Sequence, residues 1–178
     1  MKRILVGLAA LAVVLVVPMS AGATRPVPIT LTFSLNVTGN GTAAGDWTGT
    51  TTTLAVLEDK TGTATETFKL TGKGRVVHGK KVVQSGSGDS FVIQFNGKTS
   101  PGDNGTTNVK GHFVIKNGKG IYKGLHGTGK VSSTLSADGK TIAATYTGKA
   151  HLEPKKAQNQ STTQDTKTNN GKAKGKSK

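Results

Sequence analysis

The chain has 178 residues, of which 25 are Gly and 27 are Thr, and it contains no Cys. So many residues that disfavour helices exclude a helical protein, and the missing Cys excludes disulfides and thiolate chemistry. Lys and Arg number 24 against 9 Asp and Glu, which gives a net charge of +15. A surplus of this size favours anionic partners.

The first 23 residues have the pattern of an export signal. Lys2 and Arg3 precede an apolar run over residues 4–17, and the small residues Ala21-Gly22-Ala23 follow. We therefore expect cleavage near Ala23 and a secreted protein, either extracellular or periplasmic. An uncleaved membrane anchor is the alternative, and the length of the run disfavours it because a span needs about 20 residues.

Residues 154–178 differ sharply in composition from what precedes them. They include seven Lys, one Asp and almost no apolar side chains, which predicts a disordered basic tail. Subtracting the two positive charges of the signal and the six of the tail leaves +7 for residues 24–153, the expected folded domain. The lysines expected to contact anionic surfaces are Lys155, Lys156, Lys172, Lys174, Lys176 and Lys178.

The basic surplus predicts partners that are recognised by charge. Outside a cell these are anionic cell-wall polymers or lipid surfaces, bound in a salt-dependent way. A tail that serves only for solubility is the alternative. Few aromatic residues stand among the lysines, so a dedicated nucleic-acid groove and sequence-specific binding are not expected.

Strand patterns begin at residue 29 of the expected domain. Apolar and polar residues alternate from Ile29 to Val37, and the turn-forming Gly39-Asn40-Gly41 follows. A second β-rich stretch resumes through residues 43–53, and a third covers Thr61 to Lys73. A shorter strand, residues 75–78, precedes the polar Gly79-Lys80-Lys81 and another short apolar pair.

The second half of the domain continues the same rhythm. Phe91, Ile93 and Phe95 alternate with other residues and are followed by Asn96-Gly97, which predicts a tight hairpin at that point. Beyond a loop at residues 101–105, alternation resumes over 109–115, 129–135 and 142–152. The sequence therefore predicts about eight strands, joined mainly by short turns.

The expected fold class is all-β. Hairpin-linked strands pair antiparallel, and eight of them can close into a barrel without free edges. Gly111 and Gly148 interrupt strand patterns, which suits bends or close backbone approach in such a barrel. A two-sheet sandwich is the alternative, since alternation does not reveal closure.

One segment carries a family resemblance. The stretch GHFVIKNGKGIYKGLHGTG at residues 111–129, with a later Tyr146-Thr147-Gly148, resembles the allene oxide cyclase and dirigent superfamily of β-barrels. Glycines clustered around Tyr122 allow two turns in quick succession. The resemblance implies an eight-stranded antiparallel barrel, often trimeric, whose plant members direct reactions of apolar molecules in the lumen, whereas many secreted bacterial relatives have no assigned reaction.

A barrel lumen would be the place for a ligand. Glu66 shares its strand parity with Phe68, so this carboxylate either reaches the lumen or marks a less buried face. A carboxylate in an apolar lumen has a raised pKa and suits proton transfer, and Asp46 and Asp89 are the other carboxylates near strands. The residues expected to line a ligand site are Trp47, Glu66, Phe68, Phe113 and Tyr146.

Other kinds of chemistry have weak support in the sequence. His78, His112, His126 and His151 lack metal-ligand spacing. Two of them lie near turns, and His112 and His151 have the opposite parity to the apolar residues of their strands, so we expect no metal and no cofactor. No residue is predicted to be catalytic.

Three functions are therefore considered. The first is a non-enzymatic exported barrel that binds an apolar small molecule or serves as a scaffold, with the tail on anionic surfaces. The second is a cyclase or isomerase acting on an apolar ligand in the lumen. The third is a structural, oligomeric surface protein, a trimer by the family resemblance. Enzymatic activity is the less favoured of these.

Overall fold

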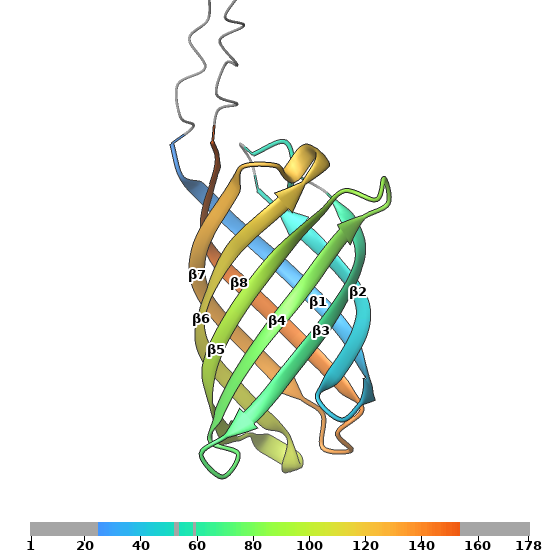
Figure 1. Ribbon diagram of the computed structural model, residues 1–178. Coiled ribbons are helices and arrows are strands. Elements are labelled where there is room, and N and C mark those ends of the chain that lie inside the picture. The colour runs from blue at the N-terminus through green and yellow to red at the C-terminus, as the bar shows by residue number, and fades with distance from the viewer. Residues whose placement is uncertain (1–24, 52–53, 59, 154–178) are drawn as a thin grey trace, which may run out of the picture.

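A computed structural model describes residues 25–51, 54–58 and 60–153. It consists of eight strands, each paired antiparallel with its neighbours in the sequence, and β8 pairs with β1 to close a barrel (Figure 1). The closed antiparallel barrel expected from the sequence is confirmed, and the two-sheet sandwich is excluded. The strands are β1 (Val27–Gly39), β2 (Thr42–Thr50), β3 (Thr61–Thr71), β4 (Val76–Ser85), β5 (Ser90–Pro101), β6 (Thr107–Lys119), β7 (Leu125–Leu135) and β8 (Thr141–Leu152).

Two single-turn 3-10 helices connect strands, η1 (Asp103–Gly105) before β6 and η2 (Gly120–Tyr122) before β7. Residues 1–23, expected as an export signal, and residues 154–178, expected as a basic tail, lie outside the described residues. Across the described part of the chain, there is no helix of the length and apolarity that crossing a bilayer requires.

Alternation along the strands builds the core. In β1, the side chains of Ile29, Leu31, Phe33 and Leu35 are buried, whereas the polar residues between them point outward. Because successive side chains in a strand point to opposite faces, one parity of every strand faces the lumen. Removing these apolar side chains from water is the main force that closes the barrel.

The two ends of the barrel differ. At the upper end in Figure 1, the described chain enters at β1 and leaves at β8, and η2 and the loop between β2 and β3 lie there. At the lower end lie the four hairpin turns that follow β1, β3, β5 and β7. The terms upper end and lower end are used in this sense below.

Glycines stand opposite each other on two pairs of neighbouring strands. Gly97 pairs with Gly111, and Gly129 pairs with Gly148. A Cβ atom on Gly111 would lie 1.9 Å from the backbone oxygen of Asn96. The close backbone approach expected at Gly111 and Gly148 is therefore confirmed, since a Cβ on Gly148 would likewise meet the oxygen of Thr128 at 2.1 Å.

The hairpin predicted at Asn96-Gly97 is wrong. Strand β5 runs through this dipeptide, and the chain turns only at η1. Gly97 does not adopt a positive φ; a Cβ there would lie 2.8 Å from Cγ1 of Val109 on the neighbouring strand. The dipeptide Asn-Gly therefore does not distinguish a glycine that a close contact between strands requires from a glycine that a turn requires.

The break expected after residue 78 is also absent. Residues Gly79, Lys80 and Lys81 lie inside β4, which continues to Ser85. Gly79 has no Cβ because the ring of Phe95 occupies that position, 2.2 Å from where the atom would be. This continuity determines the direction of the Lys81 side chain, which is described below.

The glycine-rich segment between β6 and β7 forms the predicted pair of turns. Gly120 and Gly124 have φ angles of +64° and +82°, which residues with a Cβ rarely adopt. Between them, η2 places the Tyr122 side chain in the core at the upper end, where it is fully buried.

Candidate functional site

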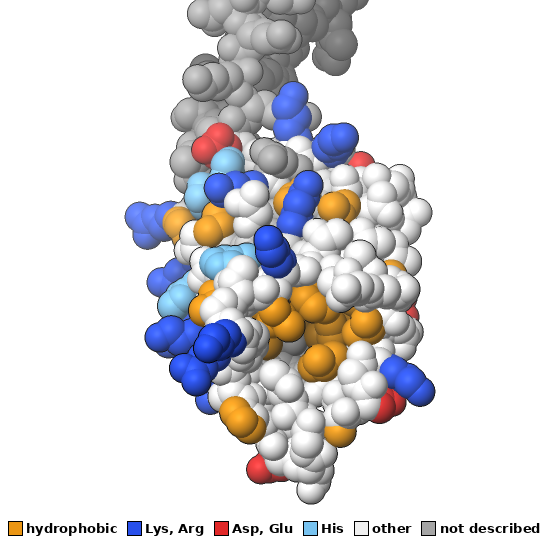
Figure 2. Space-filling view, turned by 60° about the horizontal axis from the view of Figure 1, so that its bottom comes forward, with side chains coloured by type: hydrophobic (Ala, Val, Ile, Leu, Met, Phe, Trp, Pro, Cys, Tyr) orange, Lys and Arg blue, Asp and Glu red, His pale blue; other side chains and the backbone are white. Residues whose placement is uncertain are grey.

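The lumen is hollow at the lower end. A cavity of about 210 Å³ opens there, and Figure 2 shows hydrophobic side chains gathered around it. We call this cavity the cup. Apolar side chains from five strands form its wall, while Glu66, Phe95 and Tyr146, from the middle of their strands, form its floor. The wall residues are Phe68, Leu70, Val77, Val109, Leu135 and Ile142, with Thr99, Thr107 and Ser133 near the rim.

One floor residue, Glu66, belongs to a buried ion pair. Glu66 on β3 is directly opposite Lys81 on β4, and both side chains point into the lumen. The Lys81 ammonium donates a hydrogen bond to Oε2 of Glu66. Lys81 is completely buried and Glu66 is 5% exposed, so the pair is largely withdrawn from water and the carboxylate is the member that reaches the cup.

Aromatic rings surround the ammonium. Nζ of Lys81 lies 4.6 Å from the ring centroid of Phe33, 5.5 Å from that of Phe95 and 5.4 Å from that of Tyr146. The negative faces of these rings attract a cation and replace part of the water that it has lost. The rings also pack on one another, since Tyr146 makes edge contacts with Phe33 at 5.1 Å and Phe113 at 5.2 Å between centroids.

Burial changes the proton affinities of these groups. It lowers the pKa of Lys81 below the usual lysine value, and the adjacent Glu66 carboxylate partly opposes this effect. Burial also raises the pKa of Tyr146 well above that of a free tyrosine, and the charge of Glu66 adds to the rise. Tyr146 therefore keeps its proton at neutral pH, and it lines the cup floor together with Glu66.

The upper end of the lumen is filled. Trp47, Phe91 and Tyr122 pack edge to face, with centroid distances of 5.7 Å and 4.9 Å. Nε1 of Trp47 donates a hydrogen bond of 2.8 Å to the backbone oxygen of Gln84. The side chain of Leu57, from the loop after β2, is completely buried above them. A ligand therefore has access from the lower end.

The structure divides the lumen residues expected from the sequence between these two ends. Glu66, Phe68 and Tyr146 line the cup, and Phe113 packs against Tyr146 in the middle of the lumen. Trp47 is also inside the barrel but at the filled upper end, away from the cup.

Sequence reasoning missed Lys81 because the Gly79-Lys80-Lys81 stretch was interpreted as a polar connection. The parity of Val77, Lys81 and Val83, which all point inward in one continuous strand, was the available signal. Its partner could not be inferred, because the register that brings Glu66 opposite Lys81 is not visible in the sequence.

The other carboxylates and the histidines lie outside the lumen. Asp46 is exposed on β2, and Asp89 is in the turn between β4 and β5. His78 and His112 are exposed on the outer wall, as their parity indicates. His126 and His151 stack with a centroid distance of 5.8 Å at the upper end, where His126 also lies 3.5 Å from Glu153.

Within the described ranges, no three His, Asp or Glu side chains gather in a way that could hold a metal ion. The six tail lysines expected to contact anionic surfaces, Lys155 to Lys178, lie outside those ranges.

Comparison with protein-family models, with curated proteins and with solved structures finds no match for this chain. The structure shows an eight-stranded antiparallel barrel, and its function has to be argued from the residues of the barrel itself.

Proposed function

We propose that this chain is an exported, non-enzymatic barrel that binds a small and mostly apolar molecule in the cup. The observation that carries the proposal is the contrast between the two ends of the lumen: aromatic side chains fill the upper end, whereas the lower end is open and lined by apolar side chains. Small-molecule sites are concave and mostly apolar, with a few polar groups that orient the ligand.

The cup limits the size and polarity of the ligand. Its volume of about 210 Å³ is below the range of roughly 300–1,000 Å³ that holds drug-sized molecules. Its floor offers the Glu66 carboxylate, already paired with Lys81, and the Tyr146 hydroxyl. A short hydrocarbon with one hydroxyl group fits this arrangement, because the hydroxyl donates a hydrogen bond to the carboxylate while the wall buries the chain. A ligand with its own carboxylate would meet like charge at the floor.

The experiment uses 1-hexanol as the probe and hexanoate as its anionic counterpart. We expect saturable NMR shifts of the methyl groups of Leu70, Val77 and Ile142 with hexanol, and weaker binding of hexanoate. Val109→Trp should fill the cup and abolish the shifts. Val114→Trp is the matched control, because Val114 is on the same strand but is 37% exposed on the outer wall. Shifts that do not saturate, or that survive Val109→Trp, would exclude the cup as the binding site.

A second function has a specific observation in its favour. Glu66 and Tyr146 line the same cavity, so a hydrogen-bond acceptor and a hydrogen-bond donor both face a bound molecule. This arrangement suits a cyclase or isomerase acting on an apolar ligand. The resemblance of residues 111–129 to the allene oxide cyclase and dirigent barrels supports the same class. If this function is the real one, a cup ligand is converted to an isomer and Glu66→Gln stops the conversion without preventing binding.

The remaining parts of the proposal concern location and assembly. The apolar run before Ala23 supports export, and the lysines after residue 154 support retention on an anionic cell-wall polymer or lipid surface. The family resemblance suggests a trimer, and sizing the chain in solution tests this. A purely structural surface protein would need no open cavity, so the cup favours the binding function over it.

A further inference from the structure

The outer wall of the barrel is divided by charge. The outward side chains of β1 and β2 are Thr, Ser, Asn, Ala and Pro, with Asp46 as their only ionisable group among the described residues. From the lower part of β3 around to β7, the outward side chains include many Lys and His, and Figure 2 shows them gathered on one flank. We call this flank the basic face and define it by six of its exposed lysines, Lys69, Lys80, Lys98, Lys110, Lys116 and Lys130.

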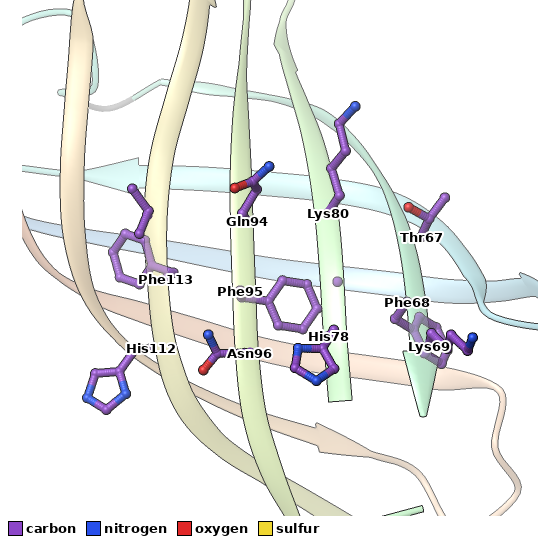
Figure 3. A pocket seen from close by; sticks show the side chains of 12 residues that line it. Thr67, Phe68, Lys69, His78, Lys80, Gln94, Phe95, Asn96, His112 and Phe113 are labelled. Carbon is purple, nitrogen blue, oxygen red and sulfur yellow. The ribbon is translucent and has the colours of Figure 1, made fainter. Parts of the chain in front are cut away.

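Strand register arranges part of the basic face in a row across the sheet. Lys69 on β3 pairs with His78, His78 with Asn96, Asn96 with His112, and His112 with Lys130 on β7. Figure 3 shows His78, Asn96 and His112 side by side on three adjacent strands. Neighbouring strands are about 4.8 Å apart, and next-but-one residues of a strand about 7 Å. The outward groups thus form a regular array.

No carboxylate interrupts this array. On β4, β5, β6 and β7, none of the outward residues that the structure describes is Asp or Glu. Among the described acidic side chains, Asp89 and Asp103 are in turns at the barrel ends, and Glu153, which follows β8, lies 3.5 Å from His126 at the upper end. Like charges held together in this way repel one another, and a bound polyanion relieves the repulsion.

Neutral hydrogen-bonding groups lie between the charges. An open hollow of about 590 Å³ runs over the basic face, where Gln94 and Asn96 lie among Lys69, Lys80 and His78. A second hollow of about 500 Å³ lies on the other side of His112, which lines both, and adds Lys110, Lys130 and the hydroxyl groups of Ser132 and Thr145. The two hollows form a shallow path across the strands, along which cations and neutral polar groups are mixed with the exposed Val114.

We infer that the basic face binds a linear acidic polysaccharide. The alternation of lysines with amides and hydroxyls matches a chain in which carboxylates alternate with sugar hydroxyls. Stacking of nucleic-acid bases needs exposed aromatic rings, and the path contains no exposed aromatic side chain. A planar membrane would touch a convex wall along a narrow strip only, whereas a flexible polymer can follow the row around it. This inference concerns the barrel wall and is independent of the cup.

The experiment compares two triple variants of the chain. The basic-face variant reverses three charges on that face, with Lys80→Glu, Lys110→Glu and Lys130→Glu. The control variant makes the same change of net charge at exposed residues in loops and turns, with Lys60→Glu, Lys73→Glu and Lys140→Glu. Both variants keep residues 154–178, so any contribution of that segment is common to them. Circular dichroism and thermal unfolding verify that both are folded.

The probe is polygalacturonate, with its fully methyl-esterified form as the neutral counterpart and duplex DNA as a competitor at equal charge. We expect polygalacturonate affinity at low salt to fall about tenfold or more in the basic-face variant and about twofold or less in the control, with a shallower salt dependence in the former. The ester should not bind.

Each contrary result overturns the inference in a different way. Equal losses in the two variants would mean that net charge alone decides binding. Binding of the ester would mean that the lysines are not the basis of recognition. Displacement of polygalacturonate by DNA at equal charge would identify nucleic acid as the preferred partner. Retention of wild-type affinity by the basic-face variant would place the site elsewhere.

Discussion

Lys81 and Glu66 face each other across β3 and β4 inside the barrel, and the buried ammonium donates its hydrogen bond to the carboxylate. Withdrawing two charges from water is costly, and their attraction offsets this cost only where the geometry and the remaining contacts are favourable. Here the rings of Phe33, Phe95 and Tyr146 supply further contacts to the ammonium. The pair places a permanent dipole at the cup floor.

Removing one member of this pair should cost more than removing both. Lys81→Met leaves a carboxylate without its partner, and we expect a loss of about 3–5 kcal/mol in the free energy of unfolding. The double variant, Lys81→Met with Glu66→Leu, leaves no unpaired charge inside the barrel. It should therefore recover much of the unfolding free energy that the single variant loses. Denaturant unfolding of the wild type, the two single variants and the double variant measures the coupling.

A matched control is available on the same strand. Lys80 is adjacent to Lys81 but is exposed on the outer wall. Lys80→Met should change the free energy of unfolding by about 0.5 kcal/mol or less. If Lys81→Met has no larger effect than Lys80→Met, the ion pair does not contribute to stability in the way described.

The two tyrosines should resist ionisation until the barrel unfolds. Burial raises the pKa of Tyr122 and raises that of Tyr146 well above the usual value, which is about 10. Above that pH, the unfolded chain releases protons that the folded chain retains, so the tyrosines make the free energy of unfolding fall as pH rises. Near-ultraviolet absorbance should show tyrosinate appearing together with the loss of the β-sheet circular dichroism. Tyrosinate absorbance at a pH near 10 in a fully folded chain would contradict this.

The alternation of apolar and polar residues predicted the barrel because burial has the same period as the strand. In β1, each apolar residue from Ile29 to Leu35 is buried where its parity places it. Close packing at Gly111 and Gly148 was also predictable, since a glycine inside a strand pattern weakens the strand unless a contact requires it.

The site was only partly predictable, because it depends on contacts between residues distant in the sequence. Glu66 could be placed on an inward parity, but its partner Lys81 depends on register. Asn96-Gly97 has the local signal of a turn, although Gly97 is required by the approach of Val109 on β6. The position of the cup depends on which end the loop containing Leu57 closes, and strand patterns do not contain this information.

Gly79 should not tolerate a methyl group. A Cβ there would lie 2.2 Å from Cζ of Phe95, whose ring also faces the Lys81 ammonium. We expect Gly79→Ala to lower the free energy of unfolding by about 1–3 kcal/mol, since the ring must move in a packed lumen. Gly86→Ala is the control, because nothing lies within 4 Å of its added Cβ. Equal thermal stability of the two variants would show that Phe95 can move aside freely.

Closure of the upper end should depend on Leu57. Its side chain is completely buried, and its backbone N–H donates a 2.8 Å hydrogen bond to the oxygen of Leu54 within the same loop. Leu57→Ala should therefore leave a cavity and cost about 2–5 kcal/mol in the free energy of unfolding. Leu70→Ala makes the same chemical change at a side chain that is 52% exposed at the lower end, where the loss should be below about 1 kcal/mol. Denaturant unfolding compares the two. The proposed binding function depends on a filled upper end and an open lower end. Similar losses of unfolding free energy in the two variants would mean that Leu57 does not close the upper end. A ligand could then enter from either side.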